Sequence, residues 1–178
     1  MYRVITFFVL SSFIAFTGCE KAAELTKFDM EYNSTVSIPS NTGINLPFNI
    51  ITPPITTNSQ STFQSNNTNS SLVEAITLKQ MTMTITSPSG ADFSFLQSVY
   101  LYISADGLPE QLIAFKDPVS TTAGNSVTLD TENVNLMDYI IKDQFTLKVT
   151  STTDETILQD HTIEVNSIFE VDAKILGL

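Results

Sequence analysis

The chain of 178 residues carries 8 Lys and Arg against 19 Asp and Glu, a formal net charge of −11 at pH 7. This length suits one folded domain, and 42% hydrophobic with 15% charged residues is too apolar for a disordered chain. The few cations are scattered, which argues against nucleic-acid binding, because that affinity depends on clustered cations.

The N-terminal segment has the pattern of a signal peptide. Arg3 precedes an apolar run over residues 4–16. A transmembrane helix needs about 20 apolar residues to cross the hydrocarbon, and this run is shorter. We therefore expect residues 1–18 to form a cleaved signal peptide. An ordinary secretory cleavage between Ala15 and Gly18 and an uncleaved anchor are the alternatives.

The tetrapeptide Phe16-Thr17-Gly18-Cys19 resembles the lipobox of bacterial lipoproteins, although Phe16 departs from the usual leucine. In that family the cysteine thiol takes a diacylglyceryl group after cleavage. An exported chain with one Cys cannot form an internal disulfide, and lipidation of Cys19 explains the odd cysteine. Lipid on Cys19 would then hold the protein on a membrane.

Residues 19–27 are expected to be the lipidated cysteine and a short tether, followed by the folded domain at 28–178. Eight extended residues reach about 27 Å, so the domain should lie close to its membrane. We expect a location in the cell envelope at the outer membrane, with the periplasmic and surface faces both open. Glu20 and Glu24 are a poor instance of the acidic surface-export signal of some Bacteroidota lipoproteins.

Alternating apolar residues predict β-strands over most of the remaining chain. Pro47 lacks a backbone donor and places its strand at an edge or a bulge. The strand candidates are marked by Phe28, Met30, Tyr32, Val36 and Ile38; Leu46, Phe48 and Ile50; Met81, Met83 and Ile85; Val99, Leu101 and Ile103; Phe145, Leu147 and Val149; Ile163 and Val165; and Phe169, Val171, Ala173 and Ile175; with weaker ones at Phe63, 113–115 and 127–129.

Three segments break this alternation. Residues 71–74 have capping-box spacing, and 135–142 begin with a capping Asn and end with a Lys, so both are expected to be brief connecting helices. Residues 56–71 are polar and low in complexity, which indicates a mobile loop or frayed edge strand, with a ligand loop as the alternative.

The element pattern predicts an all-β fold: an immunoglobulin-like antiparallel β-sandwich with two short connecting helices. The disulfide and the core Trp of antibody domains cannot exist here, because Trp is absent and the single Cys lies in the lipobox.

Motifs for catalysis, metals and cofactors are missing from the sequence. The single histidine, His161, lies in a strand pattern without a nucleophile motif and is expected to be a surface residue. One Cys and one His are too few for structural zinc, and Asp106, Asp130 and Asp154 lie in separate turns without the spacing of a calcium loop. We expect no enzyme, metal site or cofactor; an adventitious calcium site stays open.

Tyr100 and Tyr102 are the candidate binding residues. They alternate with Val99, Leu101 and Ile103, so the tyrosines should share the face opposite the core. Such a row can stack on sugars or on a protein partner. Cross-strand packing is the reading that we favour, because tyrosine suits half-buried sheet faces.

The segments INLPFNIITPPITTNSQSTF, MTITSPSGADFSFLQSVYLYISADGLPE and HTIEVNSIFEVDAKIL resemble those of uncharacterised Bacteroidota lipoproteins. This resemblance implies a lipid-anchored envelope protein without a known activity. The leading hypothesis is a non-enzymatic structural or protein-interaction module with an envelope protein partner. A glycan-binding accessory lipoprotein and a cryptic enzyme are the alternatives.

Overall fold

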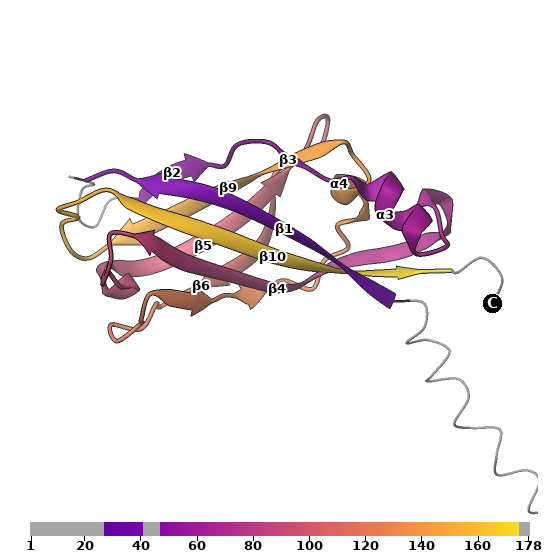
Figure 1. Cartoon of the computed structure of the whole chain (residues 1–178). Coiled ribbons are helices and arrows are strands. Elements are labelled where there is room, and N and C mark those ends of the chain that lie inside the picture. Colours follow the sequence, from indigo (N-terminus) through magenta and orange to yellow (C-terminus); the bar gives the residue numbers. More distant parts are fainter. Residues whose placement is uncertain (1–26, 41–46, 175–178) are drawn as a thin grey trace, which may run out of the picture.

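Two antiparallel β-sheets packed against each other form the body of the protein (Figure 1). The computed structural model describes residues 27–40 and 47–174. Within them the chain is an all-β sandwich, as the alternating pattern predicts. The predicted cleavage site and Cys19 lie outside the described residues.

The first sheet has four strands in the order β1-β10-β4-β7. The strand β10 pairs on one side with the whole length of β1 and on the other side with β4. The strand β10 is therefore a central strand of this sheet. These strands are β1 (Lys27–Ile38), β4 (Val73–Ser87), β7 (Ser126–Thr128) and β10 (His161–Ala173).

The second sheet has six strands, with the path β2-β9-β5-β6-β8 and β3 paired to β9. Pro47 opens β2 at the edge of this sheet, which confirms its expected edge position. The strands are β2 (Pro47–Ile51), β3 (Ile55–Thr56), β5 (Leu96–Ser104), β6 (Gln111–Lys116), β8 (Asp130–Thr131) and β9 (Gln144–Thr153).

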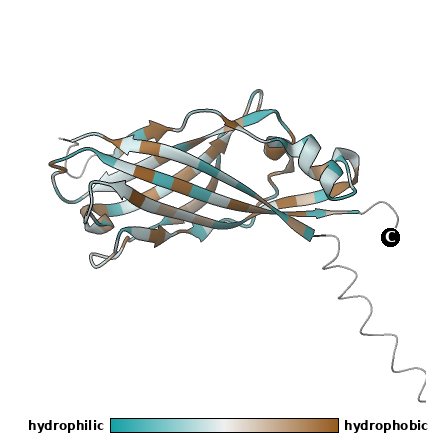
Figure 2. Cartoon of the chain, in the orientation of Figure 1, coloured by the Kyte–Doolittle hydropathy of each residue, from teal (hydrophilic) through white to brown (hydrophobic). Residues whose placement is uncertain are grey.

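One hydrophobic core fills the space between the sheets, and alternate residues of the long strands supply it. Figure 2 shows the resulting alternation of hydrophobic and hydrophilic residues along β1, β10 and β4. The predicted inward sets of β4, β5 and β9 are all buried, and Phe169, Val171 and Ala173 continue β10 into the same core. Ile163 and Phe169 therefore belong to one 13-residue strand rather than two.

The helices differ in detail from the expected ones. The predicted helix at 71–74 is wrong: η2 (Ser70–Leu72) is a single 3₁₀ turn capped by Asn69, and Val73 begins β4. The predicted helix at 135–142 is present as α4 (Met137–Ile140). A further 3₁₀ turn, η3 (Phe93–Phe95), precedes β5.

The polar segment 56–71 is neither a frayed strand nor a mobile loop, and the weak strand prediction at Phe63 is wrong. It contains α3 (Ser59–Ser65), whose Phe63 is 1% exposed and packs edge-on against Phe28 at 6.3 Å between ring centroids. Buried hydroxyls fix the two ends: Thr57 Oγ1 donates to the carbonyl of Lys142, and Thr68 Oγ1 donates to that of Lys174 over 2.7 Å. One aromatic anchor and these hydrogen bonds order a segment that composition alone marks as loop.

The long axis of the sandwich has two distinct ends. Lys27 begins β1 at the end where α3 and α4 lie, the right end in Figure 1. The loops β4–β5, β6–β7 and β9–β10 lie at the opposite end, because β4 runs in the direction of β1 while β6 and β9 are both antiparallel to β5. A 12-residue strand such as β1 spans about 40 Å. Within the described residues, no helix is long and apolar enough to cross a membrane.

Candidate functional site

The two candidate tyrosines lie on the outer face of the six-stranded sheet, as their alternation predicts. Tyr100 and Tyr102 are half-buried on β5, whereas Val99, Leu101 and Ile103 between and beside them are fully buried in the core. The register pairs Tyr100 with Phe115 on β6 and with Thr150 on β9. The structure therefore brings both tyrosines to the middle of one sheet face.

Tyr100 is held by β6 and by the loop after it. Its ring stacks beside that of Phe115, with 6.3 Å between centroids and 17° between planes. Its hydroxyl donates a hydrogen bond to the carboxylate of Asp117. This hydrogen bond raises the pKa of Tyr100 above its ordinary value, because losing the proton would leave two negative oxygens in contact.

Tyr102 lies under a lysine from the neighbouring strand. Lys148 Nζ on β9 is 4.8 Å from the centre of the Tyr102 ring, and the same ammonium pairs with Glu110. Opposite Lys148 on the edge strand β2 is Ile51, which is 63% exposed. Opposite Tyr102 on β6 is the half-buried Leu112.

These side chains form one surface that crosses four strands, which we call the outer aromatic face. None of them belongs to the hydrophobic core or to the residues packed against it within the described ranges. The residues around the tyrosines were not predicted from the sequence, although Ile51 carries a signal: it has the opposite parity to Phe48 and Ile50, which face the core. The outer aromatic face consists of Ile51, Tyr100, Tyr102, Leu112 and Phe115.

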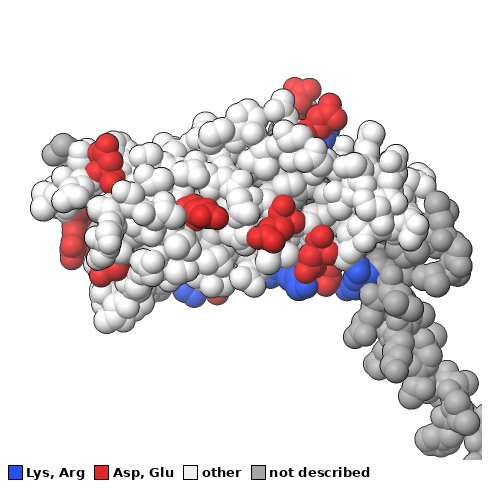
Figure 3. Space-filling view, viewed as in Figure 1, with Lys and Arg blue, Asp and Glu red and all other residues white. Residues whose placement is uncertain are grey.

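Charge on the molecule is dominated by carboxylates. Figure 3 shows acidic side chains along the length of one face and lysines mostly along its lower edge. Lysines at exposed or half-buried positions form pairs with nearby carboxylates that add little stability. The pairs are Lys27–Glu170, Lys79–Asp29, Lys116–Asp130, Lys148–Glu110 and Lys174–Glu74.

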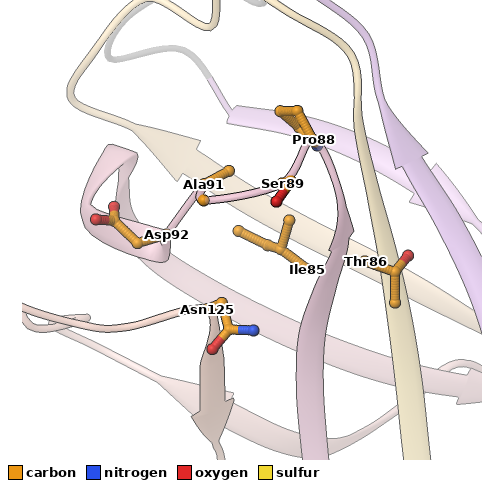
Figure 4. A pocket seen from close by; sticks show the side chains of 8 residues that line it. Ile85, Thr86, Pro88, Ser89, Ala91, Asp92 and Asn125 are labelled. Atoms are coloured by element: carbon orange, nitrogen blue, oxygen red, sulfur yellow. The ribbon is translucent and has the colours of Figure 1, made fainter.

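Two depressions lie at the end of the sandwich opposite Lys27, and they share residues 90–92. The larger, of about 460 Å³, is shown in Figure 4 and is lined by Ile85, Thr86, Asn125 and the turn 88–92. Its side chains are mostly uncharged, with polar and apolar residues mixed. In this view the Asp92 carboxylate points away from Ile85 and Asn125.

The smaller depression, of about 230 Å³, contains His161 and lies between residues 90–95 and the loop 155–158. The expectation that His161 is a surface residue is wrong, because the side chain is 8% exposed at the start of β10. Its ring packs on Phe95 at 4.8 Å between centroids, and its Nδ1 lies 2.8 Å from the carbonyl oxygen of Gln159. His161 shares the parity of the buried Ile163 and Val165, so strand alternation carried a signal for its burial, and η3 and a loop supply the covering groups.

The acidic turns are not brought together. Asp106 follows β5 near the Lys27 end, Asp154 follows β9 at the far end, and Asp130 on β8 is paired with Lys116. Among the residues that the structure describes, no group of three or more His, Cys, Asp or Glu side chains could hold a metal ion.

Comparison with known proteins gives no family. No family model and no curated protein matches the chain. Among solved structures, FLHE is 8% identical, with 83% of this chain and 98% of that chain covered and a TM-score of 0.36. Structures of Desmodium yellow mottle tymovirus (13% identity, 85% and 91% covered, TM-score 0.30) and turnip yellow mosaic virus (11%, 85% and 97%, 0.30) are similarly distant. Likeness at this level carries no argument about function.

Proposed function

We propose that this chain is an exported lipoprotein, cut before Cys19, whose β-sandwich serves as a non-enzymatic protein-interaction module in the cell envelope. The observation that carries the interaction role is the outer aromatic face. Its Ile51 is a large aliphatic side chain, 63% exposed, and Lys148 separates it from the half-buried ring of Tyr102. Exposed aliphatic and half-buried aromatic side chains on one sheet face are typical of binding sites, and aromatic residues often dominate the energy of an interface.

The arrangement of polar groups on this face also suits a protein partner. Asp117 and Glu110 already occupy the Tyr100 hydroxyl and the Lys148 ammonium, so the rings are fixed before binding. A fixed aromatic surface loses little conformational entropy when a partner covers it. Lys148 lies between Ile51 and Tyr102, so a charged group is part of this face and not only of its border.

Three finer features belong to this proposal: the immunoglobulin-like type, the signal peptide at 1–18 and the outer-membrane location. The first is supported by two antiparallel sheets with loops gathered at their ends. Support for the other two comes from the sequence, namely Arg3, the apolar run and Gly18-Cys19. The tether would join the membrane at the Lys27 end, so the opposite loops would face away from the bilayer.

The anchor is tested by Cys19→Ser in the native host. Radiolabelled palmitate should enter the parent protein and not the variant, because only a thiol accepts the diacylglyceryl group. The variant should accumulate as an uncleaved precursor or a soluble product. Normal palmitate incorporation into Cys19→Ser would overturn the lipoprotein assignment.

The interaction role is tested by placing a photocrosslinking amino acid at position 51 in the full chain in living cells. A discrete crosslinked band, with the partner identified by mass spectrometry, is expected at this position. Thr35, exposed on β1 in the other sheet, is the matched control and should give no such band. Equal crosslinking at both positions, or none at position 51, contradicts an interaction through the outer aromatic face.

A glycan-binding accessory role is the second candidate, because Tyr100 and Phe115 present two nearly parallel rings beside the Asp117 carboxylate. Sugars stack on aromatic rings and donate hydroxyl hydrogen bonds to carboxylates. Affinity electrophoresis through gels that contain envelope or host polysaccharides separates the two roles. Retardation that Tyr100→Ala abolishes would favour the glycan, whereas unchanged migration in every gel removes it.

A further inference from the structure

The pocket around His161 has no part in the proposed function. It lies on different elements from the outer aromatic face, at the loop end opposite Lys27. Its floor holds the buried Phe95, Ile157 and His161. Its rim holds two carboxylates, Asp92 and Glu155, together with Leu158, which is 83% exposed.

The hydrogen bond at Nδ1 fixes the role of the other imidazole nitrogen. A backbone carbonyl oxygen can only accept, so Nδ1 must donate to Gln159. In the neutral ring Nε2 is then an acceptor. No hydrogen bond to Nε2 is present within the described residues, and no fully buried side-chain nitrogen or oxygen there lacks a partner. Nε2 is therefore not fully buried, although His161 is 8% exposed, and His161 is one of the residues that line the pocket.

The polar side-chain groups that line this pocket are all hydrogen-bond acceptors, apart from two hydroxyls. The loops 88–95 and 153–160 that form it contain no Lys or Arg. Hydrogen bonds from Ser94 to the Asp92 carboxylate hold the pKa of Asp92 below its ordinary value, so this group stays ionised. The backbone N–H of Ser40 does the same for the pKa of Asp160, next to His161.

The size and the apolar lining of the pocket further limit the class of ligand that it could bind. A volume of about 230 Å³ is that of one long side chain rather than of a cofactor, since ligand pockets usually exceed about 300 Å³. Lysine and arginine carry an apolar stem that packs on hydrophobic surface and a head that donates several hydrogen bonds. Phe95 and Leu158 fit such a stem, and Asp92, Glu155 and His161 Nε2 fit such a head.

We propose that the His161 pocket receives a lysine or arginine side chain of a partner protein. The site is separate from the outer aromatic face and does not depend on the lipid. Its exposed Leu158 would contact apolar residues next to that cation in the partner. Because the pocket offers hydrogen-bond acceptors, its ligand should be a hydrogen-bond donor. Because the pocket has carboxylates and no cationic side chain, that donor should carry a positive charge.

The chain contains one histidine, so the imidazole signals in a ¹H–¹³C NMR spectrum report on this pocket without further assignment. The purified full chain in detergent micelles is titrated with the peptide acetyl-Leu-Arg-Leu-amide and with its lysine counterpart. Saturable shifts of the His161 signals are expected. The neutral peptide acetyl-Leu-Gln-Leu-amide should leave these signals in place.

Charge variants show whether the carboxylates bind the cation. In the double variant Asp92→Asn with Glu155→Gln, the dissociation constant of the cationic peptides should rise at least tenfold at fixed salt. An asparagine at position 92 can still cap η3 through its amide oxygen, so this variant should keep the fold. Asp106→Asn with Glu164→Gln removes the same charge from positions outside the pocket and should change the constant by less than twofold.

Two results would overturn the proposal: no shift of the His161 signals with either cationic peptide, or equal weakening by the two double variants. Both differ from a failure of the proposed function. That failure would appear as missing crosslinks at position 51 or normal palmitate labelling of Cys19→Ser, and neither readout involves the His161 signals.

Discussion

The hydroxyl of Tyr32 donates a hydrogen bond to the backbone carbonyl of Thr57 over 2.8 Å, which joins the edge strand β1 to the segment that leads into α3. The Tyr32 ring also packs edge-on against Phe145 and Phe169, at 5.3 and 5.7 Å between centroids. A residue of the first strand thereby connects both sheets and the polar segment. The stability of the sandwich should therefore depend on this junction.

Tyr32→Phe should destabilise the fold by about 1 kcal/mol, because the ring contacts remain while the buried hydrogen bond is lost. Tyr32→Ala should cost about 3–5 kcal/mol, since it also leaves a cavity between the sheets. Urea unfolding followed by circular dichroism measures both values. Equal losses in the two variants would show that the hydrogen bond, and not the ring, holds this junction.

Stability should fall at alkaline pH, and Tyr32 should contribute to the fall. Burial raises the pKa of Tyr32 above its ordinary value near 10.0. Below pH 10 the group is protonated in both states, so its stabilising effect is fully present there. Above pH 10 the unfolded chain loses this proton while the folded chain keeps it, which favours unfolding. Urea midpoints between pH 8 and 11.5 should decline less steeply for Tyr32→Phe than for the parent; parallel curves would contradict this.

Phe63→Ala should destabilise the protein by about 3–5 kcal/mol, because Phe63 is the buried anchor of α3 and packs on Phe28. Its neighbour Gln64 is exposed, and Gln64→Ala serves as the control with an expected change within about 0.5 kcal/mol. Urea unfolding of the two variants side by side is the measurement. A parent-like midpoint for Phe63→Ala would mean that α3 is not packed in solution.

Asn135→Ala should lower the free energy of unfolding by about 1–2 kcal/mol. The Asn135 Oδ1 accepts from the backbone nitrogens of Met137 at 3.0 Å and Ile76 at 3.2 Å, so one amide joins the first residue of α4 to β4. Asn133, exposed two residues earlier, provides the matched control Asn133→Ala. Thermal unfolding should separate the two variants, and coincident curves would exclude a role for the Asn135 amide.

Replacing Tyr100 and Tyr102 together with Ala should lower the urea midpoint, because both rings have cross-strand neighbours in Phe115 and Lys148. Tyr100→Phe keeps the stacked ring and removes the hydrogen bond to Asp117, so its midpoint should stay nearer the parent's. If the double variant unfolds like the parent and loses the crosslinked partner, these tyrosines serve binding and not packing.

Local sequence was sufficient to assign the faces of the long strands. Alternation placed Val99, Leu101 and Ile103 in the core and Tyr100 and Tyr102 outside it, because neighbouring side chains of a strand must point to opposite faces. It also put Pro47 at an edge, since that residue cannot donate to a ladder. The signal peptide, the lipid on Cys19 and the function of the tyrosines stay predictions.

Pairing and burial by distant segments were decided only in the tertiary structure. Alternation shows which face of a strand is apolar but not which strand lies beside it. The position of β10 between β1 and β4, and that of Lys148 over Tyr102, therefore could not be predicted from local sequence. Phe63 and His161 are covered by residues far away in the chain, Phe28 and Phe95 respectively. Contacts of that kind depend on how the two sheets close over each other, which no periodicity within a strand encodes.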